Sequence, residues 1–390
     1  MGRPSILLCG HQAGESLYGA ERSLLDVLRA LNELEFNVVV TLPGAGSEGY
    51  MQALLAESLA VAVLPYGWWQ AGKAPEAVTL RHFTGLIRRF GIDAVHANTL
   101  MLDEPLQAAR QAGIPALVHV RELPAHDPSL CTTLGTDADT VGRRVLALAD
   151  VVIANSQCVI DYFAALGLHT DKHAQTASAP QIHRVANTLD MVPLLALPSP
   201  KAKDDFTVGM LSSNQPKKGL TDLEIMASHL MTLAPRVRVA IFGPRTTALE
   251  ALLARQGQGL APANLEYRGY VAHPAQALNV VDMLVNLSRF QESFGRTVLE
   301  AMVATRPVVC YAWGALPELV VDNVTGHLVP FAEPEVAARR VAELARDHSR
   351  VVAMGRAGRE RAGEHFSQAR MRRRLKDVYS SVIPVDRAPG

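Results

Sequence analysis

Short apolar runs alternate with helical patterns along this chain of 390 residues, and this alternation restricts its fold more than any other feature. Consecutive parallel strands need a crossover connection, which is usually a helix. The order therefore predicts a parallel sheet with helices on both faces. The expected strands are 6–9, 38–42, 61–64, 94–96, 116–120 and 151–154, and the clearest helices are 23–34, 50–57 and 75–89.

The alternation stops at a proline-marked stretch and then starts again. Pro193, Pro198 and Pro200 lie in a segment without apolar periodicity, which is typical of a linker between domains. The length of the chain also exceeds what one ordinary core organises. We therefore expect two similar α/β domains, residues 1–198 and 199–367. The strands of the second are expected at 208–211, 237–242, 265–267, 283–287 and 308–311.

Composition excludes several classes of protein. The chain carries 38 acidic and 38 basic residues, a balance that argues against a nucleic-acid-binding protein driven by bulk charge. Its four cysteines show no C-x-x-C pair and no metal-ligand spacing, so neither a disulfide framework nor a zinc site is expected. Gly10 and His11 interrupt the first apolar run, which is neither a signal-peptide core nor a membrane span. These features predict a cytoplasmic enzyme.

A junction between a strand and a helix is expected in the segment ESFGRTVLE, residues 292–300. The first N–H groups of a helix have no partner within it, and the helix dipole makes that end partially positive. Gly295 permits a close backbone approach, while Arg296 and Thr297 add a cation and a hydroxyl. The junction therefore predicts a binding site for phosphate oxygens. One turn further along, Glu300 is placed to accept hydrogen bonds from a vicinal diol such as a ribose.

The same segment resembles the E-x7-E signature of the retaining glycosyltransferases of the GT-B fold, which are called glycosyl transferases group 1 or family 4. The residues at the family's spacings are Glu292, Phe294, Gly295, Glu300, Ala301, Met302, Pro307, Val308, Pro317, Glu318, Thr325 and Gly326. The resemblance implies two facing Rossmann-like domains with the donor site in the interdomain cleft. It also implies that a last helix, within about 368–390, packs back on the first domain.

The resemblance assigns donor-binding roles in the second half of the chain. Glu292 would bind or electrostatically steady the transferred sugar, and Glu300 would hold the ribose. Backbone groups at Gly269 and Tyr270 would bind the nucleobase. Because this binding uses the backbone, the sequence does not distinguish uracil from guanine. The other donor-binding residues expected from this resemblance are Ser293, Phe294, Gly295, Arg296, Thr297 and, in the glycine loop of the first half, Gly19.

A basic residue before glycine neutralises the diphosphate in the resembling family, and Lys218 before Gly219 takes that place here. The family normally adds an arginine near the position of Ser212, which this chain lacks. Either Arg296 or Lys217 substitutes for it, or diphosphate binding is weakened. A second departure is Tyr18, where the family has a glycine.

Acceptor-side candidates lie in the first half of the chain. His119 matches a histidine that faces the transferred sugar in the family, with Arg121 and Glu122 beside it as acceptor contacts. Trp68 and Trp69, near a basic helix, offer an aromatic surface for an acceptor sugar or a membrane interface, or else belong to a core.

The expected activity is a metal-independent, retaining transfer of a hexose from a UDP- or GDP-sugar to a glycan or lipid-linked acceptor, as in polysaccharide biosynthesis. The catalytic residues would be Glu292, His119 and Lys218. No cofactor is expected, and the D-x-D triplet 137–139 is interpreted as a helix start rather than a metal site. Peripheral contact with the inner membrane face would suit lipid-linked acceptors. Two alternatives remain, a nucleotide-sugar 2-epimerase of the same fold and a catalytically weak nucleotide-sugar-binding scaffold.

Overall fold

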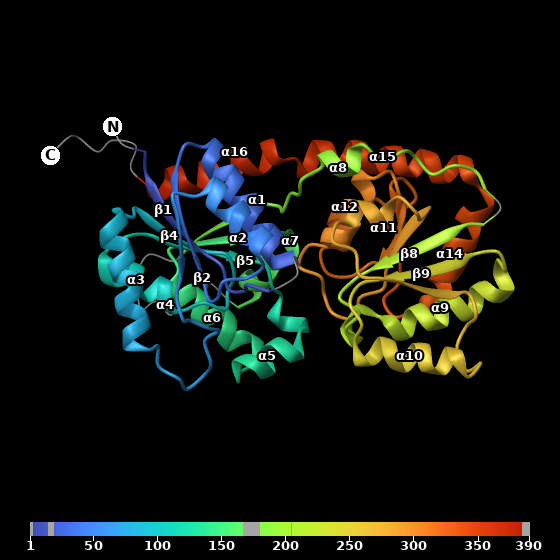
Figure 1. Cartoon of the computed structure of the whole chain (residues 1–390), viewed down its shortest axis with the longest axis horizontal. Coiled ribbons are helices and arrows are strands. Elements are labelled where there is room, and N and C mark those ends of the chain that lie inside the picture. Colours follow the sequence, from blue (N-terminus) through green and yellow to red (C-terminus); the bar gives the residue numbers. More distant parts are fainter. Residues whose placement is uncertain (1–2, 15–18, 167–179, 204, 384–390) are drawn as a thin grey trace. The chain divides into compact units, whose positions relative to one another are not determined.

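The structure, a computed structural model, describes residues 3–14, 19–166, 180–203 and 205–383, so Tyr18 lies outside the described residues. The chain divides into two compact units. Unit 1 comprises residues 1–189 and 368–390, and unit 2 comprises residues 190–367. Each unit is an α/β domain built on a parallel sheet (Figure 1), which confirms the two Rossmann-like domains expected from the sequence.

Unit 1 contains a seven-stranded parallel sheet of order β3-β2-β1-β4-β5-β6-β7. Its strands are β1 (Ser5–Cys9), β2 (Asn37–Leu42), β3 (Ala60–Val63), β4 (Ala94–Ala97), β5 (Ala116–Val120), β6 (Val151–Ala154) and β7 (Gln181–Arg184). Its helices are α1 (Gly19–Glu33), α2 (Glu48–Glu57), α3 (Ala77–Phe90), α4 (Glu104–Ala112), η1 (Pro124–His126), α5 (Pro128–Leu134), α6 (Ala138–Leu148), α7 (Gln157–Ala165) and α16 (Gln368–Val382).

Unit 2 contains a six-stranded parallel sheet of order β10-β9-β8-β11-β12-β13. Its strands are β8 (Thr207–Leu211), β9 (Arg238–Phe242), β10 (Leu265–Gly269), β11 (Met283–Asn286), β12 (Val308–Tyr311) and β13 (Gly326–Val329). Its helices are α8 (Val192–Leu195), η2 (Pro216–Lys218), α9 (Leu220–Leu233), α10 (Thr247–Gly257), α11 (Pro274–Leu278), α12 (Arg296–Val303), α13 (Leu316–Leu319), α14 (Pro334–Arg346) and α15 (His348–Phe366).

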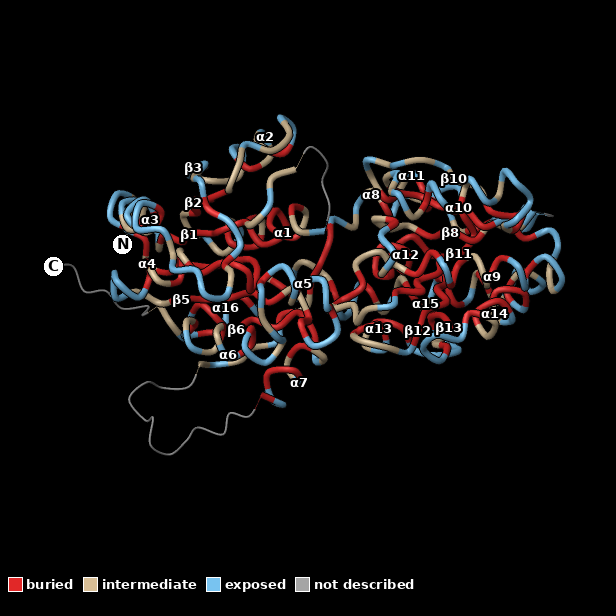
Figure 2. Tube along the Cα trace, turned by 90° about the horizontal axis from the view of Figure 1, so that it is seen from below, coloured by how far each residue is buried: buried red, intermediate tan, exposed pale blue. Residues whose placement is uncertain are grey.

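The two sheets are buried on both faces, as parallel sheets require. Figure 2 shows the buried trace running through the middle of each unit. In unit 1, Leu7 and Val95 belong to one apolar cluster, whereas Ile6 and Leu8 belong to another that also contains residues of α1 and α16. The last helix of the chain is therefore part of the core of unit 1.

Strand order reverses at one point in each sheet, between β1 and β4 in unit 1 and between β8 and β11 in unit 2. In open α/β sheets, ligands bind beyond the carboxyl ends of the strands at such a reversal. The loops that follow β1 and β4, and those that follow β8 and β11, are accordingly the places where functional side chains are expected.

One feature differs from the expected organisation. The division between the units falls after Leu189, ahead of the predicted boundary at 198, because part of the predicted linker folds as α8 and packs against α11 and α12. Pro193 lies in the first turn of α8, where its missing N–H has no intrahelical acceptor in any case. In addition, no helix in the described ranges is both long and apolar enough to cross a bilayer.

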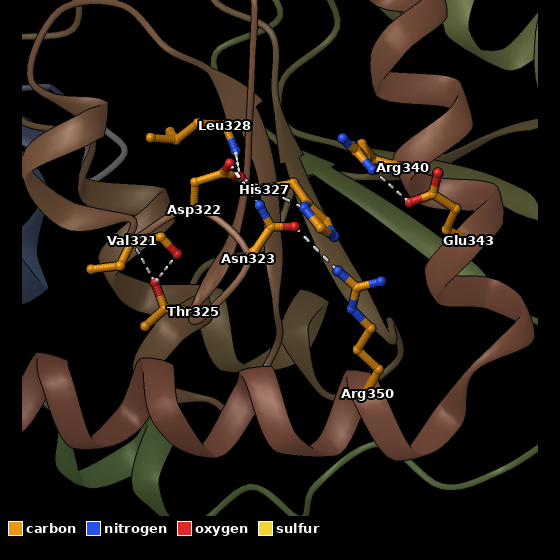
Figure 3. A network of polar contacts seen from close by, with 9 residues as sticks. All are labelled: Val321, Asp322, Asn323, Thr325, His327, Leu328, Arg340, Glu343 and Arg350. Carbon is orange, nitrogen blue, oxygen red and sulfur yellow. Dashed lines mark hydrogen bonds and ion pairs between the residues drawn. The ribbon is translucent and has the colours of Figure 1, made fainter.

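Polar and charged side chains surround β13 of unit 2, with contributions from α14 and α15 (Figure 3). The His327 side chain is fully buried, and its Nδ1 lies 3.7 Å from Oδ1 of Asp322. Arg350 donates to Asn323 at 3.2 Å, and Arg340 pairs with Glu343 at 2.9 Å. Burial lowers the pKa of His327, and the positive charges of Arg350 and Arg340 lower it further.

Acidification is expected to destabilise unit 2 through His327. Because its folded-state pKa is lowered, the unfolded chain binds the proton first, so stability is present above about pH 6.5 and is lost as pH falls below it. The loss between pH 6.5 and 5 is bounded at about 2 kcal/mol. Hydrogen exchange of the β12 and β13 amides at the two pH values measures it. His327→Leu should remove this part of the acid sensitivity, whereas equal sensitivity in both proteins would contradict the assignment.

Candidate functional site

Unit 2 brings Glu292 and Lys218 together beyond the carboxyl ends of β8 and β11. Lys218, in η2 after β8, places its Nζ 2.8 Å from Oε1 of Glu292, which follows β11. The Ser288 hydroxyl donates to the same carboxylate oxygen at 2.8 Å. The two charged side chains are 21% and 15% exposed. Two predicted catalytic residues 74 positions apart in the sequence thus form one ion pair.

The Glu292 carboxylate remains ionised in this setting. Burial alone would raise its pKa, but the charge and hydrogen bond of Lys218 outweigh burial, with further hydrogen bonds from Ser288 and Asn286. The net effect is a lowered pKa of Glu292. The pair therefore presents a fixed negative and a fixed positive charge at the same edge of the sheet.

A second ion pair, which the sequence did not predict, joins the loop after β11 to neighbouring elements of this site. The single Nε–H of Arg289 is shared between both oxygens of the buried Asp222 carboxylate, at 2.9 and 3.0 Å, and Nη2 donates to Oδ1 at 2.7 Å. The hydroxyl of Tyr311 donates to Asp222 at 2.6 Å, and the Arg289 backbone N–H donates to the carbonyl of Lys217 at 2.8 Å. Arg289 thereby links the loop after β11 to η2, and its place just after a strand was the available signal.

The turn before α12 has the geometry that the sequence predicts for the junction. Gly295 precedes the helix with φ of 94°, and a Cβ there would lie 2.5 Å from Leu316. Arg296 and Thr297 occupy the first turn. Glu300 is buried within α12, and its Oε1 lies 3.6 Å from Nε of Arg296. The carboxylate predicted to hold a ribose is therefore paired with an arginine of the same helix.

Side chains beside this turn have different surroundings. Phe294 is buried against Phe366, with ring centroids 5.7 Å apart, so contact of this residue with a donor is left to its backbone. Ser293, by contrast, is partly exposed.

Lys217 and Lys218 both lie over the ring of Phe290, with Nζ atoms 4.8 and 4.4 Å from its centroid. The two lysines are therefore neighbours at one aromatic face.

A polar cavity of about 460 Å³ lies where the loops after β8 and β9 meet. Asn214 joins these loops, because its side-chain amide donates to the carbonyl of Pro244 and its own carbonyl accepts from Thr246. Arg245 lines this cavity and supplies a cation on the side of unit 2 that contains Ser212. The resembling family has an arginine near that position, which this chain lacks. The lining residues of the cavity are Gln215, Pro216, Arg245, Thr246, Thr247, Ala248 and Glu250.

The predicted nucleobase segment ends β10. Gly269 has φ of 87°, with open space at its Cβ position, and its carbonyl accepts from the Gly243 N–H at 3.0 Å. The side chain of Tyr270 is 42% exposed. Gly269 is the last residue of β10, and Tyr270 follows it. Since β10 neighbours β9, both residues share an edge of the sheet with the cavity.

In unit 1, His119 forms the end of a hydrogen-bonded cluster at the carboxyl ends of β4 and β5. Arg121 donates from Nη2 to Nδ1 of His119 at 3.2 Å, from Nε to Asn98 at 2.8 Å and from Nη1 to Asn187 at 2.5 Å. Burial lowers the pKa of His119 well below its usual value, with help from the charge of Arg121, so the imidazole is neutral. Sequence reasoning missed Asn187, which no motif marks.

Glu122 connects the two loops of unit 1 through both of its oxygens. Oε1 accepts from the Thr99 hydroxyl at 2.7 Å, and Oε2 accepts from the backbone N–H groups of Leu100 and Arg121. Burial raises the pKa of Glu122 against these hydrogen bonds. Both oxygens of Glu122, which was predicted to contact an acceptor, are therefore engaged within the protein.

The two adjacent tryptophans have different environments, and this corrects one of the predictions. Trp69 is only 6% exposed, donates from Nε1 to the carbonyl of Leu100 and carries Arg144 over its ring at 4.8 Å. It belongs to the core and cannot stack on an acceptor sugar. Trp68 is 40% exposed, and its ring lies 6.1 Å from that of His11, a residue after β1 that the prediction omitted.

The remaining predicted positions lie at helix starts. Gly19 is exposed at the first residue of α1. Asp137 accepts a hydrogen bond from the Thr140 N–H at the N-terminus of α6, which confirms that the D-x-D triplet starts a helix.

Comparison with known families identifies both halves of the chain. Residues 18–177 match the model described as glycosyl transferase 4-like domain, and residues 205–347 match the one described as glycosyl transferases group 1. Together the two matches cover most of the chain. The chain belongs to the group 1 glycosyl transferases. The resemblance of the E-x7-E segment is thus confirmed at the level of the family.

Curated relatives of this group 1 glycosyl transferase match only part of it. A D-inositol 3-phosphate glycosyltransferase of Segniliparus rotundus is 32% identical over 176 residues, which are 42% of this chain and 37% of the relative. The putative glycosyltransferase EpsD of Bacillus subtilis is 25% identical over 47% of this chain and 48% of its own length. The chain thus matches half or less of the length of these relatives.

Among solved structures, the Anabaena protein Alr3699/HepE, determined in complex with UDP and glucose, superposes with a TM-score of 0.74 at 20% identity. The match covers 97% of this chain and all of the Anabaena chain. A likeness at this identity shows the fold, which is GT-B with two Rossmann-like domains.

Proposed function

We propose that this protein is a retaining, metal-independent glycosyltransferase that moves a hexose from a UDP- or GDP-sugar to a glycan or lipid-linked acceptor. The observation that carries the proposal is the Lys218–Glu292 pair beyond the carboxyl ends of β8 and β11, near the N-terminus of α12. That arrangement, in a member of the group 1 glycosyl transferases, supplies charges where a nucleoside diphosphate and its sugar would meet.

Cleavage of the bond between sugar and diphosphate leaves negative charge on the leaving phosphate and positive charge on the sugar. Lys218, the first-turn amides of α12 and Arg296 would stabilise the leaving group. Glu292, ionised beside Lys218, would steady the oxocarbenium-like sugar. Retention would follow if the leaving phosphate accepts the proton of the acceptor hydroxyl on the same face.

The finer parts of the proposal rest on separate observations. The Asp137 carboxylate caps α6, in line with the interpretation of the D-x-D triplet as a helix start rather than a metal site. A glucose-containing UDP complex of a protein with the same fold supports a nucleotide-sugar donor. Cys9 and Cys310 are buried free thiols, which suits the proposed cytoplasmic location. Peripheral contact with the inner membrane face and a role in polysaccharide biosynthesis follow from the proposed acceptor.

Calorimetric titration of UDP, GDP, ADP and their common sugar conjugates, with and without divalent metal, tests the donor. We expect one nucleotide class to bind without metal, and the corresponding nucleotide sugar to yield a glycoside with the anomeric configuration of the donor. A sugar inverted at C2 and joined to no acceptor would instead indicate the 2-epimerase. Nucleotide binding without turnover over a broad acceptor panel would indicate the scaffold.

Glu300→Ala is expected to weaken nucleotide binding by about 1–3 kcal/mol, because a carboxylate that accepts ribose hydroxyls is lost. Titration of the nucleotide identified in the screen measures the effect. Glu343→Ala is the matched control, since Glu343 pairs with Arg340 on α14 and has no proposed donor contact. Equal affinities of the two variants would overturn the ribose assignment.

A further inference from the structure

The last helix of the chain contacts the histidine cluster of unit 1 through one tyrosine. The hydroxyl of Tyr379, on α16, lies 2.7 Å from Nδ1 of His96, on β4. The two residues are 283 positions apart in the sequence, and their side chains are 1% and 0% exposed. A hydrogen bond so deeply buried is shielded from competition by water, so it can control the state of the imidazole.

The direction of this hydrogen bond follows from the chemistry of its partners. Burial raises the pKa of Tyr379, so its hydroxyl keeps its proton, and a buried O–H requires an acceptor. Burial and the charge of Arg121 lower the pKa of His96 to about 3, so its ring is neutral. Tyr379 therefore donates to Nδ1 of His96, which leaves the ring proton on Nε2.

His96 transmits this restraint to His119. Their rings are stacked, with centroids 5.4 Å apart and an angle of 25° between planes. A guanidinium has no acceptor, so the Arg121 contact places the proton of His119 on Nε2 as well. Nε2 of His96 forms no hydrogen bond within the described part of the chain, whereas the His119 ring also interacts with the backbone of Val185. Both rings of the stacked pair therefore carry their proton on Nε2.

We propose that Tyr379 is a positioning residue for His119, acting through His96. It holds His96 in the Nε2–H tautomer and thereby fixes the ring against which His119 stacks. The inference rests on the proposed function for its consequence, since His119 is the residue assigned to the transferred sugar. The positioning itself can be measured without any substrate.

Tyr379→Phe tests the positioning because it removes the hydroxyl and keeps the ring that packs at 4.9 Å from Phe36. Tyr50→Phe is the matched control, since Tyr50 is equally buried on α2 and its hydroxyl has no hydrogen-bond partner among the described residues. Imidazole ¹⁵N shifts of both proteins are recorded with labelled histidine, and His96→Gln and His119→Gln variants assign the signals. We expect the Nδ1 signal of His96 to move toward a mixture of tautomers in Tyr379→Phe alone, with a shift in the His119 signals.

Turnover of the donor found in the screen provides the second measurement. We expect Tyr379→Phe to lower kcat about threefold to tenfold, with unchanged nucleotide affinity and with Tyr50→Phe like the wild type. His119 signals that are the same in the two variants would overturn the positioning role. A wild-type protein that turns over no donor would refute the proposed function, while the ring signals would still decide the positioning.

Discussion

Replacing Lys218 with alanine is expected to lower kcat of the proposed transfer by about 100- to 1000-fold, the typical effect of removing one group that stabilises charge in a transition state. The substitution removes the cation nearest the leaving group and leaves Glu292 with only its hydrogen bonds. Since both side chains are mostly buried, the unpaired carboxylate should also cost about 1–3 kcal/mol of folding free energy. Steady-state turnover and amide exchange in unit 2 measure the two effects.

Lys217→Ala provides the matched control for the Lys218 variant. Lys217 lies over the same Phe290 ring, and it is Lys218 whose Nζ lies 2.8 Å from the carboxylate of Glu292. A decrease below tenfold is expected for Lys217→Ala. Adding Glu292→Gln to Lys218→Ala should recover stability without recovering turnover. Equal losses in the two lysine variants would contradict a specific role for Lys218.

The contribution of Glu292 to the pH dependence of stability should change sign when Lys218 is replaced by alanine. In the wild type its pKa is lowered, so the pair stabilises the fold above about pH 4.5 and this contribution is lost as pH falls through the lowered value. Without Lys218, burial becomes the dominant influence and is expected to raise the pKa above 4.5. Stability of Lys218→Ala would then decrease as pH rises through that value, which denaturant unfolding between pH 4 and 8 would detect.

Gly219→Ala is expected to destabilise unit 2 by about 2–5 kcal/mol. One part of this cost arises because a residue with a Cβ disfavours the left-handed backbone conformation, and the other because the Cβ would overlap a neighbouring group. Gly219 has φ of 84° between η2 and α9, and a Cβ there would overlap the carbonyl group of Leu287. The obstacle is backbone next to β11, so it cannot rotate away as a side chain would. Relief of the overlap would displace Lys218, and nucleotide affinity should fall as well.

Gly259→Ala separates backbone strain from overlap in this prediction. Gly259 also belongs to unit 2 and has φ of 73°, but a Cβ there would have no neighbour within 4 Å. Its substitution should cost about 1–2 kcal/mol, the backbone contribution alone. Denaturant unfolding followed by exchange of unit 2 amides compares the variants. If the two alanine variants lose the same stability, close packing against Leu287 is not what requires Gly219.

The sequence predicted eleven of the strands because their apolar runs are local signals of burial on both faces of a sheet. It missed β7, whose residues Gln181–Arg184 are largely polar, and β13, whose four residues begin with a glycine. Both lie at the edge of a sheet, where one side of the strand has no neighbour in the sheet. Their assignment depends on pairing with β6 and β12, which no local pattern reports.

The sequence by itself determined the repeated α/β organisation, the family and the turn before α12, because each depends on residues close together in the chain. Tertiary structure alone decided that Lys218 pairs with Glu292, that Arg289 binds Asp222 and that Tyr379 donates to His96. It also decided that Trp69 belongs to a core. These contacts join residues far apart in the chain, which come within hydrogen-bonding distance only when parallel strands pair and helices pack on the sheets.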